Sequence, residues 1–80
     1  MMIIKVLGGG CANCKKLYGI AEQAIGELGI EAELLKVEDL QEIISFGVMR
    51  TPALVINEKV KTSGRIPKTS EVKKYISEEM

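Results

Sequence analysis

Cys11 and Cys14, separated by two residues, are the side chains in this sequence best suited to chemistry. They follow three consecutive glycines at residues 8–10 and stand at the start of a stretch with the apolar spacing of a helix. Residues three apart on a helix share a face, with Cβ atoms about 5–6 Å apart. A disulfide needs a Cβ separation of roughly 3.5–4.5 Å, which a slightly distorted first turn supplies. We therefore expect this pair to open and close with little backbone movement.

The position of Cys11 at the start of the expected helix predicts that it is the nucleophile. Unpaired N–H groups and the positive end of the helix dipole favour a thiolate over a thiol there. Lys15 and Lys16 add positive charge nearby. Because the thiolate is the attacking species in thiol–disulfide exchange, Cys14, one turn further on, is expected to resolve the mixed disulfide.

The residues next to the cysteines complete the candidate site. Gly10 has no side chain, so a partner's backbone can approach Cys11 closely. The supporting residues expected on these grounds are Gly10, Ala12, Asn13 and Lys15.

Two other interpretations of the cysteine pair stay open. Two thiolates can carry copper(I), or share a zinc ion between two molecules. A closed zinc site within one chain is not expected, because zinc takes four ligands and the sequence has neither a third cysteine nor a histidine. Heavy-metal-associated domains, which also place C-x-x-C after their first strand, have the element order β-α-β-β-α-β. The second alternative is a binding module that uses the cysteines for neither purpose.

Length and composition limit the remaining possibilities. Eighty residues are enough for one domain, spanning 1–80, with an aliphatic core because only 4% of residues are aromatic. Eleven basic and eleven acidic residues balance, so neither nucleic acid nor a membrane surface is an expected partner. The sequence has no apolar run of about 18 residues and no signal-peptide pattern. We therefore expect a cytoplasmic protein, and nothing in the sequence requires more than a monomer.

The elements that must position the cysteines follow from hydrophobic periodicity and from turn residues. Asp39 is expected to cap a short helix that closes near Gly47, and Thr69 or Ser70 to cap the last helix. The first two strands, joined by a helix, must be parallel, and the last two form a hairpin around Asn57. A four-stranded mixed sheet with helices on both faces, in the order β-α-β-α-β-β-α, is the compact α/β solution. The expected strands are 2–7, 31–37, 53–56 and 59–63, and the expected helices are 12–28, 40–47 and a segment after Pro67.

Three features together resemble the thioredoxin superfamily: the C-x-x-C after the first strand, the Thr51–Pro52 pair before the third strand, and the element order. Within this superfamily the chain resembles the very small archaeal and bacterial proteins called redox-active disulfide protein 2, and in length it also resembles small glutaredoxins. The resemblance implies a minimal thioredoxin-like fold, thiol–disulfide oxidoreductase activity on protein disulfides, and no cofactor. It also implies a cis bond at Pro52, which would pack its loop against the active-site disulfide, while the backbone of Thr51 faces an extended partner segment.

The sequence departs from the better-known members of this superfamily around its cysteines. No tryptophan precedes Cys11, and neither Ala12 nor Asn13 is the proline found inside typical motifs. Because the Cys-Pro-Tyr-Cys pattern is missing, a glutathione site is not expected. The resemblance instead implies reduction by a thioredoxin reductase-like flavoprotein.

Overall fold

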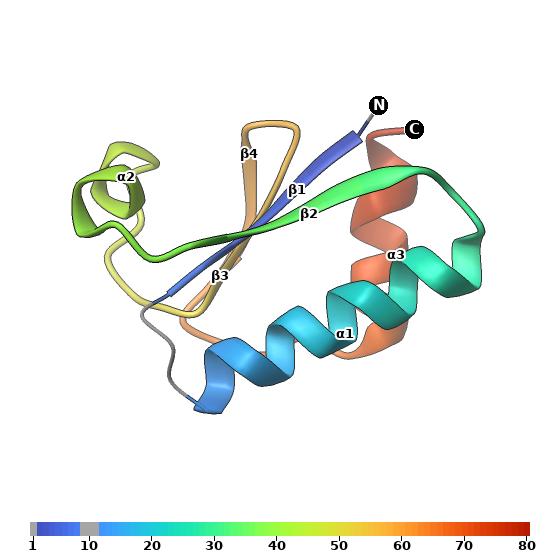
Figure 1. Cartoon of the computed structure of the whole chain (residues 1–80), viewed down its shortest axis with the longest axis horizontal. Coiled ribbons are helices and arrows are strands. Elements are labelled where there is room, and N and C mark those ends of the chain that lie inside the picture. Colours follow the sequence, from blue (N-terminus) through green and yellow to red (C-terminus); the bar gives the residue numbers. More distant parts are fainter. Residues whose placement is uncertain (1, 9–11) are drawn as a thin grey trace.

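The computed structural model describes residues 2–8 and 12–80, and its elements follow the predicted order β-α-β-α-β-β-α (Figure 1). The strands are β1 (Met2–Leu7), β2 (Ala32–Val37), β3 (Ala53–Ile56) and β4 (Lys59–Ser63). The helices are α1 (Ala12–Leu28), α2 (Leu40–Ser45) and α3 (Thr69–Glu78). The bounds agree with the sequence predictions to within two residues: β2 begins at Ala32 and not at residue 31, and α2 ends at Ser45 and not at residue 47.

The four strands form one mixed sheet in the order β2-β1-β3-β4. Strand β1 is parallel to β2 and antiparallel to β3, and β3 and β4 form the predicted antiparallel hairpin. The central position of β1 and β3 explains their nearly continuous apolar sequences, because both faces of a central strand are covered. Because β1 and β3 are antiparallel, the carboxyl end of β1 lies beside the start of β3.

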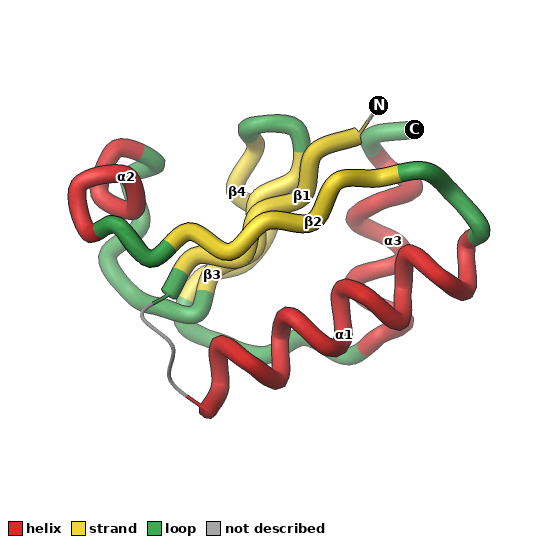
Figure 2. Tube along the Cα trace, viewed as in Figure 1, coloured by secondary structure: helices red, strands yellow, loops and turns green. Residues whose placement is uncertain are grey.

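Helices α1 and α3 lie side by side on one face of the sheet and cover the larger core (Figure 2). Alternate residues of the central strands, such as Ile4 and Leu54, point into this core. Small side chains at Ala21 and Ala24 of α1 are fully buried, which lets the helix approach its neighbours closely. The buried members of this core are Met2, Ile4, Val6, Leu17, Ala21, Ala24, Leu54, Ile56, Val72 and Ile76.

The opposite face of the sheet carries a smaller core under α2. Ile43 of this helix packs with Leu7 and Val55, which occupy the alternate positions of β1 and β3. Because α2 has only six residues, it covers one end of this face. Asp39 caps the helix as predicted, accepting a hydrogen bond from Gln41 N at 2.9 Å. Helices thus lie on both faces of the sheet, as expected.

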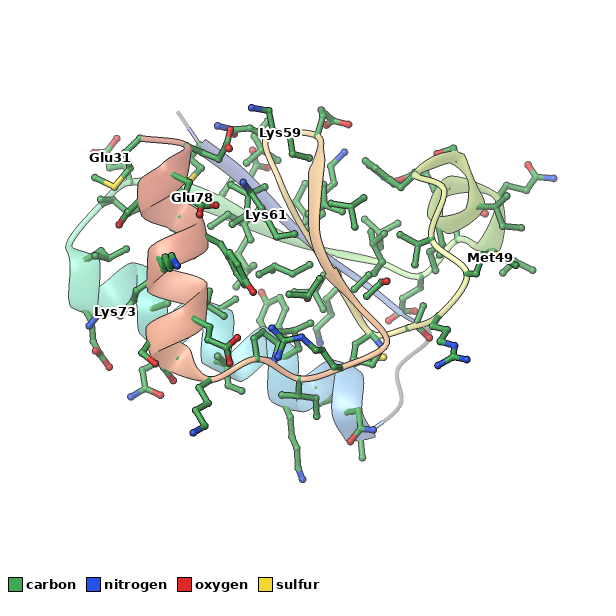
Figure 3. The ribbon with its side chains drawn as sticks, turned by 180° about the vertical axis from the view of Figure 1, so that it is seen from behind. Glu31, Met49, Lys59, Lys61, Lys73 and Glu78 are labelled. Atoms are coloured by element: carbon green, nitrogen blue, oxygen red, sulfur yellow. The ribbon has the colours of Figure 1, made fainter. Side chains whose placement is uncertain are left out.

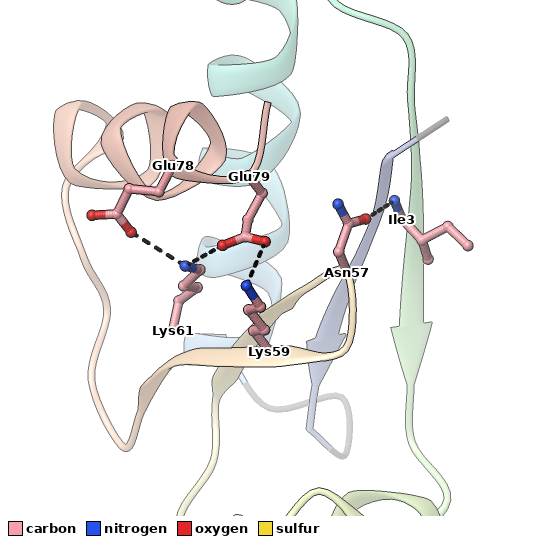
Figure 4. Close-up of polar contacts among 6 residues, drawn as sticks. All are labelled: Ile3, Asn57, Lys59, Lys61, Glu78 and Glu79. Atoms are coloured by element: carbon pink, nitrogen blue, oxygen red, sulfur yellow. Dashed lines mark hydrogen bonds and ion pairs between the residues drawn. The ribbon is translucent and has the colours of Figure 1, made fainter.

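The hairpin between β3 and β4 turns through the two residues Asn57 and Glu58, both with positive φ (49° and 68°). Such a pair of left-handed residues is what a type I′ turn requires. Asn57 Oδ1 accepts a hydrogen bond from Ile3 N at 3.0 Å, which ties the turn to β1 (Figure 4). Glu58 forms an ion pair with Lys5 at 3.1 Å.

The start of the last helix is one residue earlier than predicted. Lys68, and neither Thr69 nor Ser70, is the N-cap residue of α3. Lysine has no acceptor for the free N–H groups, and the helix start is held instead by Glu71, whose Oε1 accepts from Lys68 N at 3.2 Å. A carboxylate in the first turn also interacts favourably with the helix dipole.

Candidate active site

Cys14 lies in the first turn of α1, and its side chain is only 6% exposed. Cys11 and Gly10, the predicted nucleophile and its neighbour, lie outside the described residues. In the sequence, Cys11 immediately precedes Ala12, the first residue of α1. The predicted supporting residues Ala12 and Asn13 are exposed in the same first turn.

Gly8, the residue directly after β1, packs against Cys14. A Cβ placed on Gly8 would overlap Cys14 Sγ and would come within 3.2 Å of Cys14 Cβ. The same Cβ on Gly8 would also lie 3.7 Å from the Cβ atom of Thr51. The amide of Gly8 is fixed by a 2.9 Å hydrogen bond to Val37 O at the end of β2. The absence of a side chain at Gly8 therefore makes room for the sulfur.

The loop before β3 brings a second predicted segment to this place. The Thr51–Pro52 peptide bond is cis, Pro52 is buried and Thr51 is exposed. Pro52 O accepts a hydrogen bond from Gly64 N at 2.9 Å, which ties this loop to the residue after β4. Cys14 and Thr51, 37 positions apart in the sequence by their numbers, thus meet across Gly8.

A small cavity of about 60 Å³ opens beside Cys14. Lys15, the remaining predicted supporting residue, lines it together with Lys36 and Glu38 from the end of β2 and the residues after it. Lys36 Nζ lies 4.8 Å from the centre of the Tyr18 ring, a distance typical of a cation–π contact. Charged groups of both signs therefore surround the opening toward the buried thiol.

A larger and mainly apolar depression of about 740 Å³ lies between α2 and the loop before Pro52; we call it the α2 groove. Glu38 and Thr51 line it, so it adjoins both the small cavity and the cis bond. Its apolar lining comes from Leu40, Ile43, Ile44, Val48 and Met49.

The sequence pattern singled out Cys14, Lys15, Thr51 and Pro52, and the structure brings all four to the carboxyl end of β1, beside the start of β3. It did not single out Gly8, the first of the three consecutive glycines before Cys11. The position of this glycine, directly after a buried strand and six residues before a cysteine, is the signal that could have identified it. No local sequence pattern identifies Lys36 or Glu38, which reach the site through the pairing of β1 with β2. Nor does one identify the α2 groove, which depends on how α2 sits over the sheet.

Two negative findings concern the described residues alone. Within residues 2–8 and 12–80, no three His, Cys, Asp or Glu side chains gather in a way that could hold a metal ion. No helix in the same ranges is long and apolar enough to cross a lipid bilayer. The order of elements also differs from the β-α-β-β-α-β order of heavy-metal-associated domains.

Comparison with known proteins agrees with this geometry. A family model described as a thioredoxin domain matches residues 2–77. A thioredoxin of Methanothermobacter thermautotrophicus is 39% identical over 77 residues, covering 96% of this chain and 100% of the relative. A thioredoxin of Methanocaldococcus jannaschii is 36% identical over 76 residues, covering 95% of this chain and 87% of the relative. The chain belongs to the thioredoxin family.

Proposed function

We propose that this protein is a thiol–disulfide oxidoreductase in which Cys11 attacks a protein disulfide and Cys14 resolves the intermediate. In the first step the Cys11 thiolate bonds to one substrate sulfur, and the other substrate sulfur leaves as a thiolate. In the second step Cys14 loses its proton and attacks Cys11, and the first substrate sulfur leaves. The substrate gains two electrons and two protons as a dithiol, and the protein keeps a Cys11–Cys14 disulfide.

The observation that carries this proposal is the burial of Cys14 in the first turn of α1, beside Gly8 and three residues after Cys11. A resolving cysteine must be shielded from outside disulfides but close to its partner in the sequence. Membership of the thioredoxin family supports oxidoreductase activity in general, and both relatives are named thioredoxin.

The start of α1 suits the role proposed for Cys11. This helix has 17 residues, and its first turn contains no acidic residue that would oppose a thiolate. Lys15 and Lys16 supply positive charge in that turn. A cysteine beside such a helix start has a lowered thiol pKa and is more reactive at neutral pH.

The substrates we propose are protein disulfides, which would approach along the exposed Thr51. Its backbone would pair with an extended substrate segment, because Thr51 lies beside Gly8 and Cys14. We propose a thioredoxin reductase-like flavoprotein as the reductant, because the motif lacks the pattern of glutathione-dependent proteins. The protein itself would work as a cytoplasmic monomer without a cofactor.

A redox titration tests this function. Metal-free protein is equilibrated in dithiol/disulfide buffers, quenched by alkylation, and its thiols are counted by intact mass. We expect a reversible two-electron transition between about −320 and −120 mV, the range of known exchange proteins and cellular pools. Cysteines that stay reduced throughout, or that join only between molecules, would refute the proposal and make copper(I) or zinc binding the next hypothesis to test.

A further inference from the structure

We propose that Arg50 is a specificity-determining residue that selects protein disulfides whose reactive cysteine has an aspartate or glutamate beside it. Its guanidinium would bind that carboxylate while Cys11 attacks the neighbouring sulfur. This inference rests on the proposed function and names the charge of the preferred substrates.

The side chain of Arg50 is held along its aliphatic stem. A Cβ added to Gly64, the residue directly after β4, would lie 3.0 Å from Arg50 Cβ, 3.7 Å from Cγ and 3.1 Å from Cδ. The stem therefore lies against the backbone of Gly64, while the residue as a whole stays exposed, as is typical of a long charged side chain. Gly64 also has a left-handed backbone, with a φ of 73°. Only a residue without a side chain fits this place easily, which makes the contact with Arg50 possible.

This contact places Arg50 beside the segment that we propose to pair with the substrate. Gly64 N donates a 2.9 Å hydrogen bond to Pro52 O, so the surface on which Arg50 lies is fixed to the loop before β3. The next residue along, Thr51, belongs to the same loop and lies near Cys14. A substrate segment extended along Thr51 would therefore pass within reach of the guanidinium.

Arg50 belongs to a different surface from the α2 groove, although it comes from the same loop. Its neighbour Met49 lines the groove and lies at the surface beside α2 (Figure 3). Arg50 does not line the groove, because its stem lies on Gly64, in the connection between β4 and α3. A contact with the Arg50 guanidinium is therefore separate from apolar contacts along α2.

The guanidinium of Arg50 is available to a ligand. The other arginine of the sequence, Arg65, donates to Glu71 Oε2 at 2.7 Å and to the Tyr75 hydroxyl at 3.1 Å. Among the residues that the structure describes, no ion pair involves Arg50. A planar guanidinium binds a carboxylate through two parallel hydrogen bonds. Because the stem of Arg50 is already held, less conformational freedom is lost when a carboxylate binds.

The surrounding charges do not oppose an acidic partner. Among the residues that line the small cavity beside Cys14, Lys15 and Lys36 outnumber Glu38. The whole chain has eleven basic and eleven acidic residues, so its net charge favours neither acidic nor basic substrates. A preference for acidic segments would therefore come from local charge, and it should weaken as the salt concentration rises.

Synthetic peptides that differ in one side chain provide the probe. Each contains one cysteine activated as an uncharged mixed disulfide with pyridinethiol. When the Cys11 thiolate bonds to the peptide sulfur, the pyridine sulfur leaves as pyridinethione, whose absorbance gives the rate. The residue beside the peptide cysteine is glutamate, glutamine or lysine, placed before it or after it. Each rate constant is divided by that for the small, uncharged dipyridyl disulfide, which reports the cysteine chemistry alone.

Three substitutions alter the proposed contact. Arg50→Gln removes the charge, Arg50→Lys keeps the charge without the planar guanidinium, and Arg50→Glu reverses the charge. Lys74→Gln is the matched control, because Lys74 is exposed on α3 and takes part in no ion pair among the described residues. It changes the net charge by as much as Arg50→Gln. Circular dichroism verifies that each variant is folded.

We expect the wild-type protein at low salt to react about threefold faster with the glutamate peptide than with the glutamine peptide, the usual effect of an exposed ion pair. Arg50→Gln should lose this preference, and Arg50→Lys should keep only part of it. Arg50→Glu should prefer the lysine peptide. Lys74→Gln should keep the wild-type order.

The possible failures are distinguishable. Equal relative rates for the glutamate and glutamine peptides, in both positions, would overturn the specificity inference alone, since dipyridyl disulfide would still react. A preference that survives in Arg50→Gln, or that Lys74→Gln reduces equally, would also overturn it and assign the selection to other charges. Failure of the wild-type protein to react with dipyridyl disulfide would overturn the proposed function as well.

Discussion

Gly8 and Cys14 are in direct contact, and the sulfur of Cys14 occupies the space that a side chain at Gly8 would need. The contact joins the end of β1 to the first turn of α1. It sets the depth at which the thiol is buried, because the backbone of Gly8 is itself held by Val37 O. The role of Gly8 is therefore steric.

Replacing Gly8 by alanine should destabilise the reduced protein. The new methyl group must push Cys14 Sγ or the start of α1 aside, and such overpacking costs about 1–3 kcal/mol. Urea unfolding followed by circular dichroism measures the loss. Gly26→Ala is the control, since a Cβ at Gly26 of α1 meets no atom within 4 Å. That variant should gain about 0.5–1 kcal/mol from the better helix propensity of alanine. Equal stability of Gly8→Ala and the wild type would contradict the contact.

The burial of Cys14 predicts slow alkylation of its thiol in the folded protein. In a Cys11→Ser variant, iodoacetamide should modify Cys14 at least about tenfold more slowly in buffer than in concentrated urea, because reaction requires local opening. Intact mass spectrometry over time gives both rates. Equal rates in the two conditions would show that the thiol is accessible in solution, and the assignment of Cys14 as the resolving cysteine would then lose its basis.

Local patterns predicted the elements well because each has its own signal. The continuous apolar run of residues 53–56, the alternation in residues 59–63, the Asp39 cap and the glycines before Cys11 are all readable within a few positions. The last helix shows where such reading fails. Thr69 and Ser70 are typical cap residues, but Glu71 holds the helix start through Lys68 N, so the cap falls one residue earlier.

The surroundings of the cysteines could be predicted only in part. The C-x-x-C pattern and the Thr51–Pro52 pair are local, and both were identified. The contact of Gly8 with Cys14, and the presence of Lys36 and Glu38 beside them, depend on the parallel pairing of β1 with β2. The α2 groove depends on how a six-residue helix sits over one end of the sheet. No pattern of neighbouring residues contains that information.

An ion cluster links β4 to the end of α3 and predicts a dependence of stability on pH. Lys61 Nζ lies 2.9 Å from Glu79 Oε2 and 3.2 Å from Glu78 Oε1, and Lys59 also reaches Glu79 at 3.3 Å (Figure 4). The hydrogen bond from Lys61 lowers the pKa of Glu79, and Lys59 contributes in the same direction. A carboxyl group with a lowered pKa stabilises the folded protein above its unfolded pKa, about 4.3, and this stability is lost as the pH falls through the folded pKa.

Glu79→Gln should therefore lower stability near neutral pH and reduce the loss of stability on acidification below about pH 4.3. Urea unfolding at a series of pH values down to about 3 measures both. The difference from wild type should shrink at high salt, because the cluster is near the surface. Glu22→Gln on α1, which takes part in no ion pair within the described ranges, is the control. Parallel pH profiles for Glu79→Gln and wild type would contradict the prediction.

Thr62 of β4 is 7% exposed, and its hydroxyl oxygen is buried without a hydrogen-bond partner among the described residues. It lies opposite Leu54, a member of the larger core. A buried hydroxyl without a partner costs about 1–3 kcal/mol, so Thr62→Val, which keeps the shape, should stabilise the protein by about 1 kcal/mol. Thr62→Ser keeps the hydroxyl but removes a methyl group, and should be the least stable of the three because it adds a cavity. Urea unfolding of all three proteins gives the order; a Thr62→Val variant less stable than wild type would mean that the hydroxyl is hydrogen-bonded in solution.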